Sequence, residues 1–178
     1  RFTVSKLQPV FTVNGTDIIF GESELVTFET TENITGIVKI EIGGKNYTGI
    51  IYEGKGNVTV ENLKVGGHDV TLYFDGNRKY LNATAYNTFD VGKTTIPVVV
   101  IAQNITYGDK EIFTIYVNST GKVNVTIDNE VIYLNKDIDK KLIFELPGVL
   151  TVGNYTVNVD YSGNENYTRN SGSADFKV

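Results

Sequence analysis

The sequence predicts an all-β protein that contains one structural unit twice. Residues that favour strands (Val, Ile, Thr, Tyr and Phe) are abundant, whereas alanine, the best helix former, occurs only four times. Apolar and polar residues alternate along short runs, which is the period of a strand with one buried face. The final stretch, GNYTVNVDYSGNENYTRNSGSADFKV, also matches GGHDVTLYFDGNRKYLNATAYNTFDV, which begins about 87 residues earlier.

The same offset relates the two halves of the chain along their length. Phe2 and Val4 correspond in turn to Phe89 and Val91, so residues 1–5 resemble the tail of a preceding repeat. We therefore expect two domains, 1–91 and 92–178, taken from a longer array. The further matches are Lys6 with Lys93, Ile18 with Ile105, Gly21 with Gly108, Val38 with Val125, and Ile40 with Ile127.

Two predicted strands show the alternation most clearly in each half. Their expected inward faces are Val26, Phe28 and Thr30 with the matching Phe113, Ile115 and Val117, and Val70, Leu72 and Phe74 with the matching Val157, Val159 and Tyr161. The residues between them, such as Asp69, Thr71, Asn158 and Asp160, are polar, as expected of an antiparallel sheet with one solvated face. Near each end, Phe89 and Phe176 are predicted core residues.

Turn residues separate these runs. Gly43 and Gly44 lie between two alternating segments and predict a hairpin, because glycine tolerates positive φ. The sequences GNRKY and GNENY predict a second turn near the end of each half. The runs number about seven per half, which is typical of an immunoglobulin-like β-sandwich. With an odd number of strands, the two ends of a unit should lie at opposite poles, so the domains should be arranged end to end.

Composition narrows the class of function. The chain has no cysteine, so disulfides and thiolate metal sites are impossible. Its net charge of −5 and pI near 4.9 argue against nucleic-acid binding, which depends on clustered lysine and arginine. The longest apolar run, Ile96 to Ala102, is far shorter than a membrane-spanning helix, so we expect no membrane insertion of this fragment. No cofactor is expected.

Several motifs give the chain a family resemblance. NITYGD (Asn104 to Asp109), VNVTIDN, and LTVGNYTVNVDYSGNENY (Leu150 to Tyr167) resemble the tandem bacterial-type Ig-like repeats of archaeal adhesin-like cell-surface proteins. The first half resembles them less closely, through IIFGE, VKIEIGGKNYTG, LKVGG and DGNRKY. The resemblance implies an extracellular spacer or stalk that serves cell adhesion and surface display. It also implies a monomer whose first partners are neighbouring repeats. The alternative is an adhesion module that binds a glycan or protein on the surface of another cell.

The strongest functional signal is Asn followed two positions later by Thr. It occurs ten times, where residue frequencies alone would give roughly three, and predicts N-glycosylation of a surface glycoprotein. An alternative is that Asn and Thr are simply common in duplicated strands. The candidate sites are Asn14, Asn33, Asn46, Asn57, Asn82, Asn104, Asn118, Asn124, Asn154 and Asn166.

Catalysis is not expected. A Ser-His-acid triad needs a histidine base, and the single histidine, His68, corresponds to Tyr155 in the second half. Tyr155 is predicted to be a structural tyrosine that buries its ring and returns its hydroxyl to the backbone, as in many sandwiches. Histidine can do only part of this, so the first half should have a looser corner.

Three other chemistries remain as alternatives. Asn135 to Lys141 and GNENY collect oxygen ligands for calcium, although neighbouring lysines favour plain solvated turns. Lys6, Lys93 and Asn87 are candidates for an isopeptide crosslink, although lysines near linkers lack the desolvation that attack requires. Tyr73 and Tyr86 belong to the first half only, so they are the candidate ligand contacts, because exposed aromatic rings stack on sugars.

Overall fold

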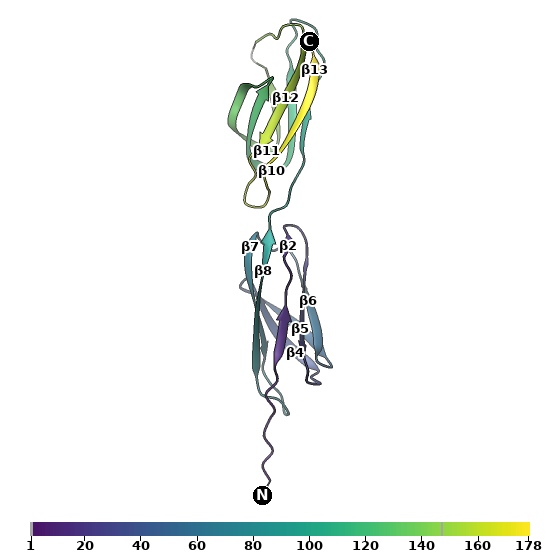
Figure 1. Cartoon of the computed structure of the whole chain (residues 1–178), viewed down its shortest axis with the longest axis vertical. Helices are drawn as coiled ribbons and strands as arrows, with labels where there is room; N and C mark the ends of the chain where they lie inside the picture. Colours follow the sequence, from purple (N-terminus) through teal and green to yellow (C-terminus); the bar gives the residue numbers. More distant parts are fainter. Residues whose placement is uncertain (1, 147) are drawn as a thin grey trace. The chain divides into compact units, whose positions relative to one another are not determined.

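The computed structural model describes residues 2–146 and 148–178 and is built from strands and loops (Figure 1). Its contacts divide the chain into Arg1–Gly92, called unit 1 here, and Lys93–Val178, called unit 2. This division falls one residue after the boundary expected from the sequence. Within the described residues, no helix is long and apolar enough to cross a membrane.

Unit 1 forms one sheet that closes over its own core. The strand order is β1-β3-β6-β5-β4-β7-β8-β2, so β1 and β2 lie at opposite ends of the sheet although they follow each other in the chain. The sheet must therefore fold back on itself, which gives the two facing layers of a sandwich. The strands are β1 Phe11–Asn14, β2 Ile18–Ile19, β3 Glu24–Thr30, β4 Gly36–Ile42, β5 Lys45–Tyr52, β6 Lys55–Val60, β7 Gly66–Phe74 and β8 Ala83–Gly92.

Unit 2 has the same plan with fewer, longer strands. The order is β11-β10-β12-β13, and β9 pairs with β10. The first part of β10 pairs with β9 and the later part with β12, so β10 takes the place of both β3 and β4. The strands are β9 Val98–Ile101, β10 Ile112–Ile127, β11 Glu130–Glu145, β12 Asn154–Tyr161 and β13 Asn170–Lys177.

The number of strands in each unit therefore differs from the expected number of about seven. Unit 1 has eight strands and unit 2 has five, because β10 replaces β3 and β4, β11 replaces β5 and β6, and the segment that matches β2 does not form a strand. In unit 1 the turn from β5 to β6 uses Glu53 and Gly54, both with positive φ. Unit 2 has one residue fewer here, because Lys141 pairs with Tyr116 as Lys55 pairs with the matching Glu29, which leaves Lys140 alone, with φ 63°, in place of the two turn residues. A single residue cannot form the two-residue turn, so the chain continues as one irregular strand.

The offset of 87 residues is not constant, contrary to the sequence alignment. Tyr73 pairs with Lys39, whereas Asp160, which is 87 residues after Tyr73, pairs with Asn124, only 85 residues after Lys39. Val38 and Ile40 therefore correspond to Val123 and Val125, and not to Val125 and Ile127. Register shifts in the β10–β11 ladder restore the longer offset further along the chain.

The predicted inward faces are confirmed. All of the named residues on β3, β7, β10 and β12 are buried except Thr30, which is half-buried. Phe89 and Phe176 are buried in the cores of unit 1 and unit 2 respectively, and each unit has its own core cluster. The Gly43–Gly44 turn is also confirmed, with φ of 55° and 77°. The chain thus forms two immunoglobulin-like β-sandwich units.

The first and last segments of unit 1 run parallel to each other. Leu7 donates its N–H to the Lys79 carbonyl at 3.0 Å, and its own carbonyl accepts the N–H of Leu81 at 2.9 Å. Further along, Ile18 lies in parallel register with Val91. Because the two segments run in the same direction, the start of unit 1 lies beside the beginning of its last segment, away from the end of that segment.

Unit 2 repeats this arrangement at positions 87 residues later. Thr94 forms a parallel bridge with Tyr167, and its carbonyl accepts the N–H of Thr168 at 2.8 Å. At the other end, Ile105 donates its N–H to the Lys177 carbonyl at 2.9 Å. In each unit, therefore, the chain begins at one end of the sandwich and leaves it at the other.

Candidate functional site

Tyr73 and Tyr86, the ligand contacts suggested by the sequence, lie on the outer face of the layer formed by β5, β4, β7 and β8. Tyr73 is registered with Thr84, and Tyr86 is registered with Thr71. The two tyrosines are therefore diagonal neighbours on adjacent strands, at a spacing that long side chains can bridge. The structure brings them together on an exposed surface.

Three more exposed apolar side chains continue the same diagonal. Lys39 pairs with Tyr73, so Ile37, two residues before Lys39, is the next diagonal neighbour. Ile37 pairs directly with Ile50, and Tyr52 follows Ile50 on the same face of β5. We call these five side chains the tyrosine stripe. Their exposed fractions are Tyr52 65%, Ile50 71%, Ile37 66%, Tyr73 38% and Tyr86 71%.

An ion pair crosses the tyrosine stripe. The Lys39 ammonium lies 2.7 Å from a carboxylate oxygen of Asp75, and both side chains are largely exposed. Lys39 lies opposite Tyr73, and Asp75 lies at the level of Ile37. The ion pair therefore crosses the line that joins Tyr73 to Ile37. Its contribution to stability is small because it is solvated. It nevertheless places hydrogen-bonding groups inside an otherwise apolar surface.

The matching face of unit 2 is polar. Every position of the stripe carries a charged or hydroxyl side chain there, and two of the charges form the ion pair of Lys122 with Asp137 at 2.8 Å. The structural counterparts are Asp139 for Tyr52, Asp137 for Ile50, Lys122 for Ile37, Asp160 for Tyr73 and Ser173 for Tyr86. The stripe therefore belongs to unit 1 and not to the shared fold.

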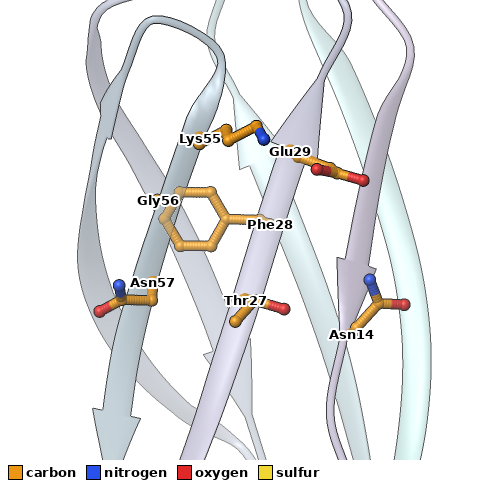
Figure 2. Close-up of a pocket in the computed structure, with 7 residues that line it drawn as sticks. All are labelled: Asn14, Thr27, Phe28, Glu29, Lys55, Gly56 and Asn57. Carbon is orange, nitrogen blue, oxygen red and sulfur yellow. The ribbon is translucent and has the colours of Figure 1, made fainter.

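A shallow groove of about 400 Å³ lies on the other layer of unit 1. Figure 2 shows polar side chains of β1, β3 and β6 around it, with the Phe28 ring lying across Gly56. The ring occupies the space that a side chain at position 56 would need. The groove is lined by Asn14, Thr27, Phe28, Glu29, Lys55, Gly56 and Asn57.

The corresponding layer of unit 2 carries its own apolar patch and no tyrosine pair. By strand register Ile143 stands where unit 1 has Asn57, since Ile143 pairs with Thr114 and Asn57 pairs with the matching Thr27. Ile143 is exposed, and so are Val99 and Ile101 of β9, which pairs with the same strand, β10. Tyr116 is the single aromatic residue there, and Lys141 lies over its ring at 5.3 Å from the centroid. The outer faces of the two units therefore differ on both layers.

The ten Asn-x-Thr sites lie at the surface of both units. Eight of the asparagines are exposed, and Asn124 and Asn166 are half-buried. Two of them also have a structural contact, because the Asn104 side-chain oxygen accepts the Lys177 N–H and that of Asn124 accepts the Asn135 N–H, each at 2.8 Å. Glycosylation of these sites stays a prediction.

The corner residues Tyr155 and His68 make the same contact. The Tyr155 hydroxyl donates to the Thr151 carbonyl at 2.8 Å, and the His68 Nε2 lies 2.8 Å from the Lys64 carbonyl, which is 87 residues earlier than Thr151. Both rings stack on the adjacent core phenylalanine at an interplanar angle of 22°. The expectation of a looser corner is wrong for this contact. The histidine differs in leaving its Nδ1 buried without a partner among the described residues.

A pair of buried glutamates was missed by the sequence analysis. Glu24 and Glu111 are matched residues, and both are buried. A Glu24 carboxylate oxygen accepts the Thr16 N–H at 2.7 Å, and the Thr16 hydroxyl lies 3.1 Å from the other oxygen. The sequence signal was a carboxylate at an inward position, two residues before Val26.

Glu111 is less well satisfied. Its Oε1 accepts the N–H of Gln103 at 3.1 Å, but Gln103 replaces Thr16 and supplies no hydroxyl, so Oε2 is buried without a partner among the described residues. Burial raises the pKa of Glu111 above its ordinary value, and the Gln103 N–H opposes this shift. The buried carboxyl thus has a clear energetic cost in unit 2.

The structure does not bring together the residues that the remaining candidate chemistries would need. Lys93 donates to the Asn164 carbonyl at 2.6 Å and Asn87 donates to the Val13 carbonyl at 2.7 Å, so the two crosslink candidates have different partners. In Asn135 to Lys141, the segment weighed above as an alternative calcium site, Asp137 pairs with Lys122, which lowers the pKa of that carboxyl through a hydrogen bond and charge attraction. No group of three potential metal-ligating side chains occurs among residues 2–146 and 148–178.

Comparison with solved structures finds only distant likeness. The chain is similar over 95% of its length to 94% of the fibronectin(III)-like modules of Clostridium thermocellum CbhA, with 13% identity and a TM-score of 0.38. It is similar over 96% to 98% of a titin fragment, with 10% identity and a TM-score of 0.44. It also resembles 25% of a Parabacteroides merdae β-glucuronidase chain, with 8% identity and a TM-score of 0.36. No family model and no curated protein sequence matches the chain.

Proposed function

We propose that the chain is an extracellular, adhesin-like spacer, part of an archaeal surface glycoprotein that holds a more distal domain away from the cell envelope. The single observation that carries this proposal is the parallel pairing of the first and last segments in both units. A chain that starts at one end of a sandwich and leaves at the other gains length with each unit. Serial units of this kind would build a stalk.

The parallel pairing of the first and last segments also suits a protein that bears mechanical load. A force applied between the ends of unit 1 would load the Leu7–Lys79 and Phe20–Gly92 hydrogen bonds in shear, because both paired segments lie along the direction of the pull and these bonds lie across it. Bonds loaded in parallel must break together, whereas the bonds of a hairpin opened from its end break one at a time. The Phe20 N–H to Gly92 carbonyl distance of 2.8 Å and the shared core support a joint that resists shear.

One further observation favours the cell-surface setting, and a second is compatible with it. Eight of ten candidate glycosylation sites are exposed, which the attachment of bulky glycans requires. The units lack cysteine and rely on separate hydrophobic cores, so neither depends on the redox state of its compartment.

The dependence of the maximum dimension on the number of units tests the spacer proposal. Chains with two, four and six units, made by repeating residues 5–178, would be compared by small-angle X-ray scattering. We expect the maximum dimension to grow by a constant increment of roughly 35 to 40 Å per unit, since each unit is spanned by strands rising about 3.3 Å per residue. A matched set with a ten-residue Gly-Ser insertion after Gly92 should grow less steeply. A maximum dimension that rises only as the cube root of unit number would contradict the spacer.

A further inference from the structure

We propose that the tyrosine stripe of unit 1 binds a neutral polysaccharide. The stripe runs diagonally across β5, β4, β7 and β8, and its five side chains are between 38% and 71% exposed. Exposing apolar side chains to water is unfavourable in free energy, and contiguous exposed apolar patches often mark a binding site. This role goes beyond spacing and does not depend on it.

The stripe combines the two kinds of contact that a sugar ring needs. A pyranose has apolar C–H faces and a rim of hydroxyl groups. The rings of Tyr73 and Tyr86 can stack on the C–H faces, because an aromatic ring with a hydroxyl at one end is apolar on its face and polar at its tip. Around them, the hydroxyls of Thr71 and Thr84 and the Lys39–Asp75 pair offer donors and acceptors to the rim.

The open shape of the surface favours a polymer over a small buried ligand. Sites for small apolar molecules are concave and enclose most of the ligand. The stripe lies on the outer face of a sheet, and the hollow of about 450 Å³ that Thr71 and Tyr86 help to line is open, so a bound molecule keeps one side in water. A polysaccharide tolerates this because its unbound side remains hydrated, and a chain of sugars can follow the diagonal from Tyr86 to Tyr52.

The size of the stripe argues against a stable protein partner or a second copy. A whole tyrosine side chain contributes about 200 Å², so the three tyrosines at 65%, 38% and 71% exposure present on the order of 350 Å². Even with Ile37 and Ile50 the stripe stays below the roughly 800 Å² per partner of a standard interface. The stripe is therefore large enough for a few sugar rings and too small for a lasting protein contact.

The charges of the surface favour a neutral ligand. Lys39, the cation within the stripe, is already paired with Asp75, and Glu41 lies beside it on β4. The whole chain carries a net charge of −5. An anionic polymer would meet no unpaired cation at the centre of the stripe and would be repelled at long range.

Affinity electrophoresis tests the proposal directly. The whole chain would run through native gels that contain hydroxyethylcellulose, galactomannan or a soluble β-1,3-glucan. We expect retardation by at least one of these polymers. The double variant Tyr73→Thr, Tyr86→Thr should lose roughly tenfold or more in apparent affinity. Threonine is polar, favours strands and already occupies neighbouring positions on this face, so the variant should fold, as circular dichroism would verify.

Two matched variants make the result specific. Tyr107→Thr removes a tyrosine of unit 2 that is 64% exposed and lies outside the stripe, so it should leave retardation unchanged. Asp160→Tyr with Ser173→Tyr places the tyrosine pair on the matching face of unit 2 and should increase retardation. The proposal fails if none of the three polymers retards the chain, or if the double threonine variant is retarded as strongly as the parent. Self-association that the double variant abolishes would instead identify a second copy as the occupant and overturn the glycan assignment.

Discussion

Replacing Gln103 by threonine should stabilise unit 2, because it would supply the missing hydrogen-bond donor to Glu111. Unit 1 provides the template, in which Thr16 gives Glu24 both its N–H at 2.7 Å and its hydroxyl at 3.1 Å. In unit 2 the carboxylate receives a single N–H at 3.1 Å, and its second oxygen is buried without a partner in the described part of the chain. A hydrogen bond to a charged group contributes roughly 1.5 to 3 kcal/mol net.

Differential scanning calorimetry of the whole chain measures this effect. A gain of about 1.5 to 3 kcal/mol in a domain of this size corresponds to a rise of the unit 2 transition on the order of 10 °C. Gln103→Val is the matched control, because it keeps the branched shape and the backbone N–H but adds no hydroxyl. The reciprocal change Thr16→Val should lower the unit 1 transition. If Gln103→Thr and Gln103→Val melt at the same temperature, the orphaned Glu111 oxygen is not the cost inferred here.

Three further predictions concern stability. Phe176→Ala removes a buried ring that contacts Phe113 and Tyr155, and should cost unit 2 roughly 3 to 5 kcal/mol in urea unfolding while unit 1 is unchanged; an unaffected unit 2 would refute the assigned core. His68→Tyr should leave the unit 1 transition unchanged or higher, because a tyrosine hydroxyl can reach the Lys64 carbonyl and no buried Nδ1 remains; a clearly lower transition would show that the corners are not interchangeable. Because burial raises its folded pKa, Glu111 favours unit 2 at low pH and loses that contribution as pH rises through the folded value, so Glu111→Gln should flatten the fall of the unit 2 transition as pH rises above 4.5; an unchanged slope would contradict this assignment.

Much of the fold could be predicted because it depends on local patterns. The alternation around Val70 and Val157 fixes which face is buried, and Gly43–Gly44 fixes a two-residue turn. The long strands of unit 2 could not be predicted, because the outcome at Lys140 depends on whether one residue with positive φ makes a turn or a bulge. The two-residue shift of β4 was hidden for a similar reason, since an alternating strand looks the same after a shift of two.

The candidate site could be predicted only in part. Tyr73 and Tyr86 were identifiable as residues of unit 1 alone, but their alignment with Ile37 on one face of the sheet depends on strand register, which a single sequence does not reveal. The buried glutamates carried a signal that was available. Glu24 continues the inward series of Val26 and Phe28, so the alternation places a charged side chain toward the core, although this was not predicted. The hydrogen bonds that Thr16 donates to the Glu24 carboxylate depend on the path of a loop, which the alternating pattern does not determine.

Distances within each unit test the central claim most directly. The chain has no cysteine, so pairs of spin labels can be placed at Lys6 and Asp90 in unit 1 and at the matching Lys93 and Lys177 in unit 2. Parallel pairing of the first and last segments predicts that both distances, measured by double electron–electron resonance, are about 35 Å and agree with each other. Distances below about 15 Å, as an antiparallel pairing of these segments would give, would contradict the account.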